Sequence, residues 1–163
     1  MAAGAHIPKE LLAMMARGVS VIVGSRDAQL RPSIMRAVGS RIESDGQQVT
    51  VYLARRQSRQ LLEDLAASGQ IAAVFSEPST HRSVQLKASR VEMRPATAED
   101  EPVLAAYLRP MEAEIASVGF PAHVARTMLA HQLEDVVAVR FTPEQAFEQT
   151  PGPRAGAALG GQE

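Results

Sequence analysis

Residues 49–62, with the sequence VTVYLARRQSRQLL, contain a strand, a group of polar residues and the start of a helix. Apolar residues alternate from Val49 to Leu53, which is typical of a half-buried strand, and they take helical spacing from Leu61 onward. Three arginines and Ser58 lie between the two patterns. A helix start offers unpaired backbone N–H groups and the positive end of the helix dipole, and arginine side chains match phosphate oxygens. The stretch therefore predicts an anion-binding site, with Ser58 as the N-cap of the helix.

Length and composition predict one globular domain over residues 1–150, followed by a Gly/Pro/Ala-rich C-terminal tail over residues 151–163. The chain has 163 residues, of which 45% are hydrophobic and 21% charged, which is ordinary for a folded protein of this size. No apolar run approaches the roughly 20 residues that span a bilayer, and the N-terminus lacks a secretory signal pattern. The chain has no cysteine, which fits a cytoplasmic protein.

The charge distribution favours a local anion site over a nucleic-acid surface. The formal net charge is −1, so neither nucleic acid nor a membrane is expected as a partner. Residues 26–94 nevertheless carry 11 basic and 7 acidic side chains, whereas residues 95–163 carry 4 basic and 10 acidic ones. The positive half of the chain is the half that contains residues 55–59.

The pattern of elements predicts a mainly β protein with α-helices (α+β). Thr97 to Asp100 resembles a capping box that opens a helical stretch, which Pro110 should kink or divide. Gly39 indicates a bulge or a close approach of the backbone, and Gly69 a helix end. Few long connections join the strands, so we expect a small antiparallel barrel of six strands with helices outside it. Helices are expected over residues 8–17, 59–67 and 121–133, and strands over residues 19–24, 33–42, 49–53, 70–76, 83–93 and 136–141.

Three basic patches recur in the positive half, at residues 36–41, 55–59 and 82–87. An arginine near a strand end is most often a solvated edge residue. In a barrel, however, adjacent strands could bring the three patches together around one helix start, which favours a shared binding site. The histidines have no standard metal-ligand spacing, so no metal site is expected. His81, which precedes the third patch, is the histidine best placed to affect activity.

The order of these patches resembles that of the pyridoxamine 5′-phosphate oxidase-like, FMN-binding split-barrel family. Members typically show an Arg-led strand, then a strand leading to a Ser-Arg-Lys phosphate motif, then a second Arg-led strand. This chain has RAVGSR at residues 36–41, VTVYLARRQSRQLLEDL at residues 49–65 and RSVQLKA at residues 82–88. The resemblance covers residues 7–93. It implies a six-stranded antiparallel split β-barrel with peripheral helices, assembled as a homodimer with FMN near the subunit interface.

The resemblance also implies which residues hold the cofactor. Ser58 and Arg59 would bind the phosphate of FMN, while Gln60 stands where the family commonly has lysine, a charge that Arg55 or Arg56 could replace. The resemblance implies three further groups of residues. One strand would lie along the flavin, two residues would contact it through their backbone, and another strand would reach its polar edge. The additional residues are Arg36, Ala37, Val38 and Arg41, then Leu53 and Ala54, then Arg82, Ser83, Gln85 and Lys87.

The expected function is that of a flavin-dependent oxidoreductase with a small-molecule substrate that the sequence does not identify. The oxidase itself carries a C-terminal segment with Trp and Arg, whereas this chain has no tryptophan, so a different substrate is expected. The alternative is a non-catalytic module that binds a flavin or haem for storage, sensing or regulation. Deazaflavin is an alternative cofactor, and a scaffold with a decayed cofactor site is a third reading.

Overall fold

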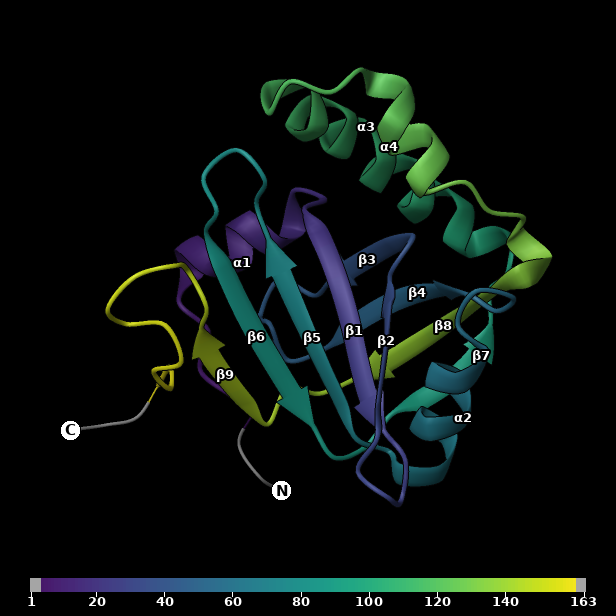
Figure 1. Cartoon of the computed structure of the whole chain (residues 1–163), viewed down its shortest axis with the longest axis vertical. Helices are drawn as coiled ribbons and strands as arrows, with labels where there is room; N and C mark the ends of the chain where they lie inside the picture. Colours follow the sequence, from purple (N-terminus) through teal and green to yellow (C-terminus); the bar gives the residue numbers. More distant parts are fainter. Residues whose placement is uncertain (1–3, 161–163) are drawn as a thin grey trace.

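Nine strands form two antiparallel sheets within residues 4–160, the part of the chain that this computed structural model describes (Figure 1). The five-stranded sheet has the order β2-β1-β5-β6-β9, and the four-stranded sheet has the order β3-β4-β8-β7. The strands are β1 (Ser20–Arg26), β2 (Pro32–Arg36), β3 (Gly39–Ile42), β4 (Val49–Ala54), β5 (Ile71–Ser76), β6 (Ser83–Ala88), β7 (Glu92–Pro95), β8 (Val136–Phe141) and β9 (Gln145–Glu148).

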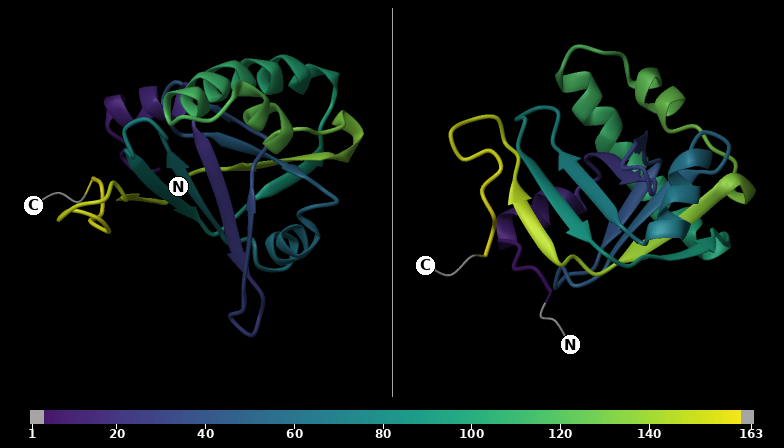
Figure 2. Two further views of the ribbon diagram at one scale, coloured as in Figure 1. Left: turned by 45° about the horizontal axis from the view of Figure 1, so that its top comes forward. Right: turned by 60° about the horizontal axis from the view of Figure 1, so that its bottom comes forward.

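In the described part of the chain, four α-helices pack around the sheets, and α3 and α4 lie side by side along one margin (Figure 2). No helix within residues 4–160 is long and apolar enough to cross a membrane. The α-helices are α1 (Lys9–Ala16), α2 (Arg59–Ser68), α3 (Glu101–Ser117) and α4 (Ala122–Met128), and the short 3₁₀ helices are η1 (Ala98–Asp100) and η2 (Leu133–Asp135).

The main core lies between the inner faces of the two sheets. Alternate residues of each strand point inward, so that Val21, Phe75 and Leu86 of the five-stranded sheet are fully buried, as are Val51 and Val139 of the other sheet. A second, smaller core lies on the opposite face of the four-stranded sheet, where α3 covers part of it. The five-stranded sheet therefore has one buried face and one outer face.

The predicted α+β class with antiparallel strands is confirmed, but the count of six strands was too low, and the strands form two sheets rather than one barrel. Residues 33–42 divide into β2 and β3 because the Ala37 N–H donates to Val21 O in one sheet, at 2.9 Å, while the Val38 N–H donates to Tyr52 O in the other, at 2.8 Å. Residues 83–93 divide likewise into β6 and β7. Strand β9 was not predicted.

Helix α3 runs through Pro110 without a break, so of the predicted kink or division, the division does not occur. Leu104 and Tyr107 before the proline and Met111 after it are all buried. We infer that this packing holds both halves of the helix in place against the missing backbone hydrogen bond. The close approach predicted at Gly39 is confirmed, because a Cβ there would lie 2.7 Å from Leu104 Cδ2.

Gly69→Ala is expected to lower the free energy of unfolding by about 2 kcal/mol or more. Gly69 ends α2 with a φ of +69°, and a Cβ there would lie 2.7 Å from the backbone oxygen of Ser89. Gly119→Ala is the control, because Gly119 also has a positive φ of +91° but nothing within 4 Å of an added Cβ. The cost of Gly119→Ala should stay near 1 kcal/mol. If urea denaturation shows equal losses of unfolding free energy for the two variants, the contact with Ser89 does not contribute to the effect of Gly69→Ala.

Candidate functional site

The start of α2 holds a buried hydroxyl without a partner. Strand β4 ends at Ala54, and residues 55–58 turn the chain into α2, so Ser58 occupies the predicted N-cap position. Its side chain makes no capping hydrogen bond, contrary to expectation. Only 2% of the residue is exposed, and within residues 4–160 its Oγ is the single buried side-chain polar atom that lacks a hydrogen bond. An unsatisfied buried hydroxyl is unfavourable by about 1–3 kcal/mol, so this atom fits a site that a polar ligand completes.

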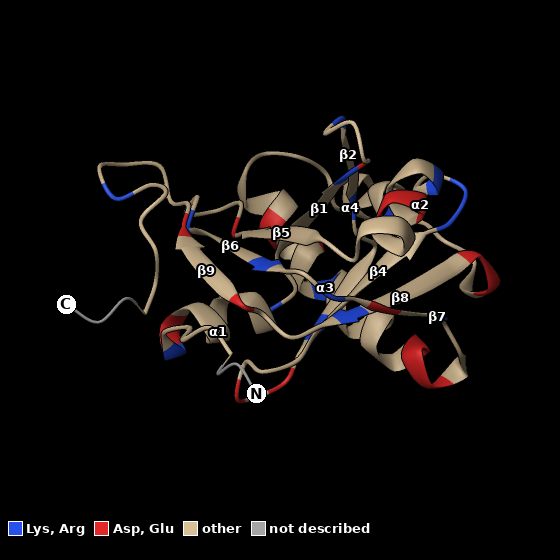
Figure 3. Cartoon of the chain, turned by 90° about the horizontal axis from the view of Figure 1, so that it is seen from below, with Lys and Arg blue, Asp and Glu red and all other residues tan. Residues whose placement is uncertain are grey.

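Two guanidinium groups from the same turn of chain are free to meet an anion. Arg55 and Arg59 are exposed, and among residues 4–160 neither forms an ion pair, whereas Arg56 lies 3.7 Å from Asp135. Both free arginines line a hollow of about 490 Å³ between α2 and β7. Figure 3 shows the basic segment of the chain that leads into α2. Positive side chains and a helix N-terminus therefore lie together here, as the sequence predicts.

The Gln60 side chain hydrogen-bonds to another residue of α2. Its Nε2 donates to Asp64 Oδ1 at 2.9 Å, and Ser33 Oγ on β2 donates to the other carboxylate oxygen of Asp64 at 2.6 Å. This network ties α2 to β2 and leaves the Gln60 amide engaged. Asp64 is only 4% exposed. The four-residue spacing of Gln60 and Asp64 could have indicated their contact, but Ser33 comes from a distant strand.

The strand residues next to this site offer backbone rather than side chains. Ala37, Val38, Leu53 and Ala54 are all buried among the apolar core residues. The backbone oxygen of Ala54 accepts from the Ser58 N–H at 3.0 Å, which fixes the turn before α2. A cofactor at the start of α2 could contact these four residues only through their main-chain groups.

The outer face of the five-stranded sheet carries Arg36, Gln85 and Lys87. The register aligns Arg36, Ile22, Val74, Gln85 and Phe147 in one row across the five strands. Arg36 Nη1 donates to Ser20 Oγ at 2.5 Å, and Lys87 Nζ lies 5.1 Å from the centroid of the Phe147 ring.

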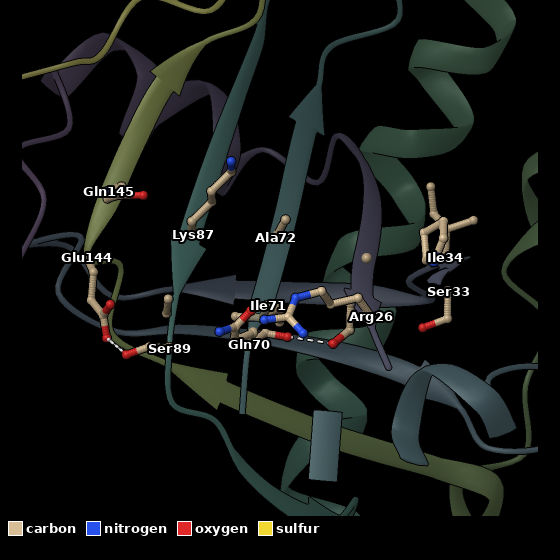
Figure 4. Close-up of a pocket in the computed structure, with 14 residues that line it drawn as sticks. Arg26, Ser33, Ile34, Gln70, Ile71, Ala72, Lys87, Ser89, Glu144 and Gln145 are labelled. Atoms are coloured by element: carbon tan, nitrogen blue, oxygen red, sulfur yellow. Dashed lines mark hydrogen bonds between the residues drawn. The ribbon is translucent and has the colours of Figure 1, made fainter. Parts of the chain in front are cut away.

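The next row along this face contains a hollow of about 660 Å³ (Figure 4). Gly24 and Ala72 are paired on β1 and β5, and the missing side chain of Gly24 and the single methyl group of Ala72 leave the hollow open. Lys87 and Arg26 line it, as does Ile34, which is 68% exposed. The outer face is therefore largely apolar, with a few cationic and amide groups set into it.

The three basic patches do not meet within one chain. Strands β1 and β5 separate Arg36 on β2 from Gln85 and Lys87 on β6, and β3 belongs to the other sheet. The expectation that adjacent strands bring the patches together was therefore wrong for a single chain, because the order β2-β1-β5-β6 places two strands between them. Arg41 lies on β3 and pairs with Glu43 at 3.0 Å.

The residues at the start of β6 contact other parts of the protein. Arg82 lies 4.0 Å from Glu10, and Ser83 is buried, with its Oγ 2.7 Å from Ser76 Oγ. The Ser83 N–H donates to Thr150 Oγ1 at 3.0 Å, so the C-terminal segment packs along β6. His81 is exposed in the preceding loop with a φ of +60°.

Comparison with known proteins shows the fold. No protein-family model matches the sequence, and no curated protein matches it either. A putative pyridoxamine 5′-phosphate oxidase from Lactobacillus delbrueckii superposes with a TM-score of 0.56 at 13% identity, covering 86% of this chain and 93% of that one. A pyridoxamine 5′-phosphate oxidase-related, FMN-binding protein from Nostoc punctiforme superposes with a TM-score of 0.52 at 11% identity, covering 92% and 89%.

A haem protein has a similar structure. HutZ, the haem storage protein of Vibrio cholerae, superposes with a TM-score of 0.50 at 16% identity, covering 85% of this chain and 92% of that one. All three identities are low, so they establish the architecture and not the ligand. The chain has the fold of the pyridoxamine 5′-phosphate oxidase-like, FMN-binding proteins, as a divergent example of it.

Proposed function

We propose that this protein binds FMN at the start of α2 and acts as a flavin-dependent oxidoreductase on a small-molecule substrate. The observations that carry the proposal are the buried, unpartnered Ser58 Oγ and the free guanidiniums of Arg55 and Arg59, which come from the same turn into α2. A phosphate dianion would accept from the hydroxyl, from the guanidiniums and from the first N–H groups of the helix. A bound flavin supplies the redox chemistry, and the protein anchors and orients it.

The proposal assigns a definite role to each group of residues. Ser58 and Arg59 hold the phosphate, with Arg55 in place of the lysine that Gln60 does not supply. The backbone of residues 37–38 and 53–54 lies along the cofactor. Arg41 is left out of this proposal, because its guanidinium pairs with Glu43 and lines a different hollow.

We further propose that the site is completed in a homodimer. In one chain, β1 and β5 separate the β6 residues Gln85 and Lys87 from β2 and α2. A second copy packed against the outer face would bring its own β6 to the first copy's β2 and α2. The exposed Ile34 and the hollow over Gly24 and Ala72 give that face an apolar projection and an apolar recess, which suits an interface between identical surfaces.

A non-catalytic haem- or flavin-binding module is the second candidate, and the fold shared with HutZ favours it. The identity of any ligand that copurifies, measured by absorbance and mass, separates the candidates. FMN or a deazaflavin that cycles between donors and acceptors supports the enzyme, whereas a haem Soret band or a flavin without turnover supports the module. A colourless protein that takes up no added cofactor would contradict both.

Ser58→Ala and Arg59→Ala are each expected to weaken FMN binding by about 1.5 to 3 kcal/mol and to leave riboflavin binding nearly unchanged. Riboflavin lacks the phosphate, so the difference between the two ligands in fluorescence titrations isolates the phosphate contacts. Arg56→Ala is the matched control, because Arg56 lies in the same loop but faces Asp135.

Ser58→Ala has a second signature in the cofactor-free protein. Because it removes an unsatisfied hydroxyl, its free energy of unfolding should equal or exceed that of the wild type. Equal losses of FMN and riboflavin in both variants would remove Ser58 and Arg59 from the phosphate site.

A further inference from the structure

The outer face of the four-stranded sheet contains a hollow of about 570 Å³, which shares only Met93 and Arg94 with the hollow at the start of α2. The register aligns Arg41, Thr50, Arg140 and Glu92 in one row across β3, β4, β8 and β7. Helix α3 covers the other end of this face through Leu104. The hollow therefore occupies the half of the face next to the β3–β4 hairpin.

Three arginines from three strands line this hollow. Arg41 and Arg140 flank Thr50, one strand away on either side, so their Cα atoms are roughly 10 Å apart by ordinary strand spacing, and both side chains can extend over the threonine. In the adjacent row, Arg94 on β7 pairs with the small Ala138 on β8. The short side chains of Thr50 and Ala138 leave the space that the guanidiniums surround.

Arg94 is held by a buried carboxylate, whereas Arg41 and Arg140 pair with exposed carboxylates, and Arg140 Nε also donates to Gln48 Oε1 at 2.8 Å. Arg94 Nη1 and Nη2 donate to the buried Asp100 at 2.7 and 2.8 Å. The Glu43 side chain is 48% exposed, and that of Glu92 is 81% exposed and lies 4.0 Å from Arg140. Exposed ion pairs of this kind contribute little, so a ligand with more charge than a single carboxylate can displace both glutamates. Figure 3 shows basic and acidic segments side by side along β8.

We propose that this hollow binds a phosphate group, held between the guanidiniums of Arg41 and Arg140 with Arg94 behind them. Two planar guanidiniums on either side of one point match the oxygens of a phosphate dianion. The volume exceeds that of the phosphate group alone, so the ligand is expected to be a phosphate monoester whose organic part lies toward Met93 and Ala138. The proposal does not rest on FMN binding, since neither Arg41 nor Arg140 lines the hollow at the start of α2, although Arg94 lines both hollows.

Inorganic phosphate and phenyl phosphate are the probes, and amide chemical shifts of Thr50 and Ala138 in ¹⁵N-labelled protein report on the floor of the hollow. The titration uses full-length Arg59→Ala protein, so that phosphate held at the start of α2 does not obscure the result. We expect saturable shifts at both amides. Tighter binding of phenyl phosphate would identify the ligand as an ester, and equal binding would identify free phosphate.

Arg41→Gln and Arg140→Gln should each weaken phosphate about tenfold or more, whereas Glu43→Gln should strengthen it, because it frees Arg41. Arg109→Gln, an exposed arginine on α3 without an ion pair among residues 4–160, is the control for general loss of positive charge. Losses of the same size in Arg109→Gln, or shifts at Thr50 and Ala138 that do not saturate, would overturn the proposal. Since Arg41 and Arg140 are both exposed, their variants should fold, and melting curves check this.

Discussion

Asp100→Ala is expected to lower the free energy of unfolding by about 3 kcal/mol. The carboxylate is 4% exposed and accepts from Tyr52 Oη at 2.9 Å, from both terminal nitrogens of Arg94, and from the Thr97 N–H at 2.9 Å. Its removal leaves a buried phenol without an acceptor and a guanidinium without its counter-charge. The Arg94 side chain is 54% exposed and can turn toward water, which keeps the cost near the lower end for a broken buried pair.

Urea denaturation measures this loss, and Glu99→Ala is the control because Glu99 is an exposed carboxylate one residue away. Tyr52→Phe should cost about 1 kcal/mol, since it removes only one of the hydrogen bonds. A loss below 1 kcal/mol for Asp100→Ala would show that the network does not anchor the start of α3 to the four-stranded sheet.

The same carboxylate predicts a pH dependence of stability. The hydrogen bonds from Arg94 hold the pKa of Asp100 well below its usual value, while burial and the bond to Asp100 raise the pKa of Tyr52 to about 12. A depressed acid pKa contributes stability that is fully present above the unfolded-state value of about 3.9 and is lost as the pH falls below it. The stability difference between wild type and Asp100→Ala should therefore be constant between about pH 5 and pH 9 and shrink steadily below about pH 4.

Local patterns explain which parts of the fold the sequence predicts. The helix over Arg59–Ser68, the left-handed end at Gly69 and the capping box at Thr97 all depend on residues within one or two turns of each other. The break between β2 and β3 does not, because it lies where the hydrogen-bond partners change from β1 to β4, and both partner strands are distant in sequence. A period of two indicates a strand but not the sheet to which it belongs.

The candidate site divides in the same way. Ser58 and Arg59 are predictable because a helix start and its basic residues are contiguous in sequence. The burial of Asp64 is not, since it depends on Ser33 from β2. The separation of Arg36 from Lys87 follows from the strand order, which no local pattern specifies. The roles of these residues toward a cofactor stay predictions that binding measurements must test.

Val74→Asp is expected to convert the proposed homodimer to a monomer and to weaken FMN binding with it. Val74 lies at the centre of the row that runs from Arg36 to Phe147, on the outer face of the middle strand. In an isologous interface each copy would bury one new carboxylate, at a cost of about 1–3 kcal/mol apiece. Together the two substitutions should raise the dissociation constant of the dimer by about a hundredfold or more.

Light scattering at several protein concentrations measures the assembly, and an FMN titration of the same samples measures the site. Val118→Asp is the matched control, because it makes the same chemical change at a residue that is 41% exposed in the loop between α3 and α4. A Val74→Asp protein that stays dimeric would place the interface elsewhere. A monomeric Val74→Asp protein that binds FMN as tightly as the wild type would show that α2 and its neighbouring strands form the whole site. Loss of both properties together is the result that ties Gln85 and Lys87 of one copy to Ser58 and Arg59 of the other.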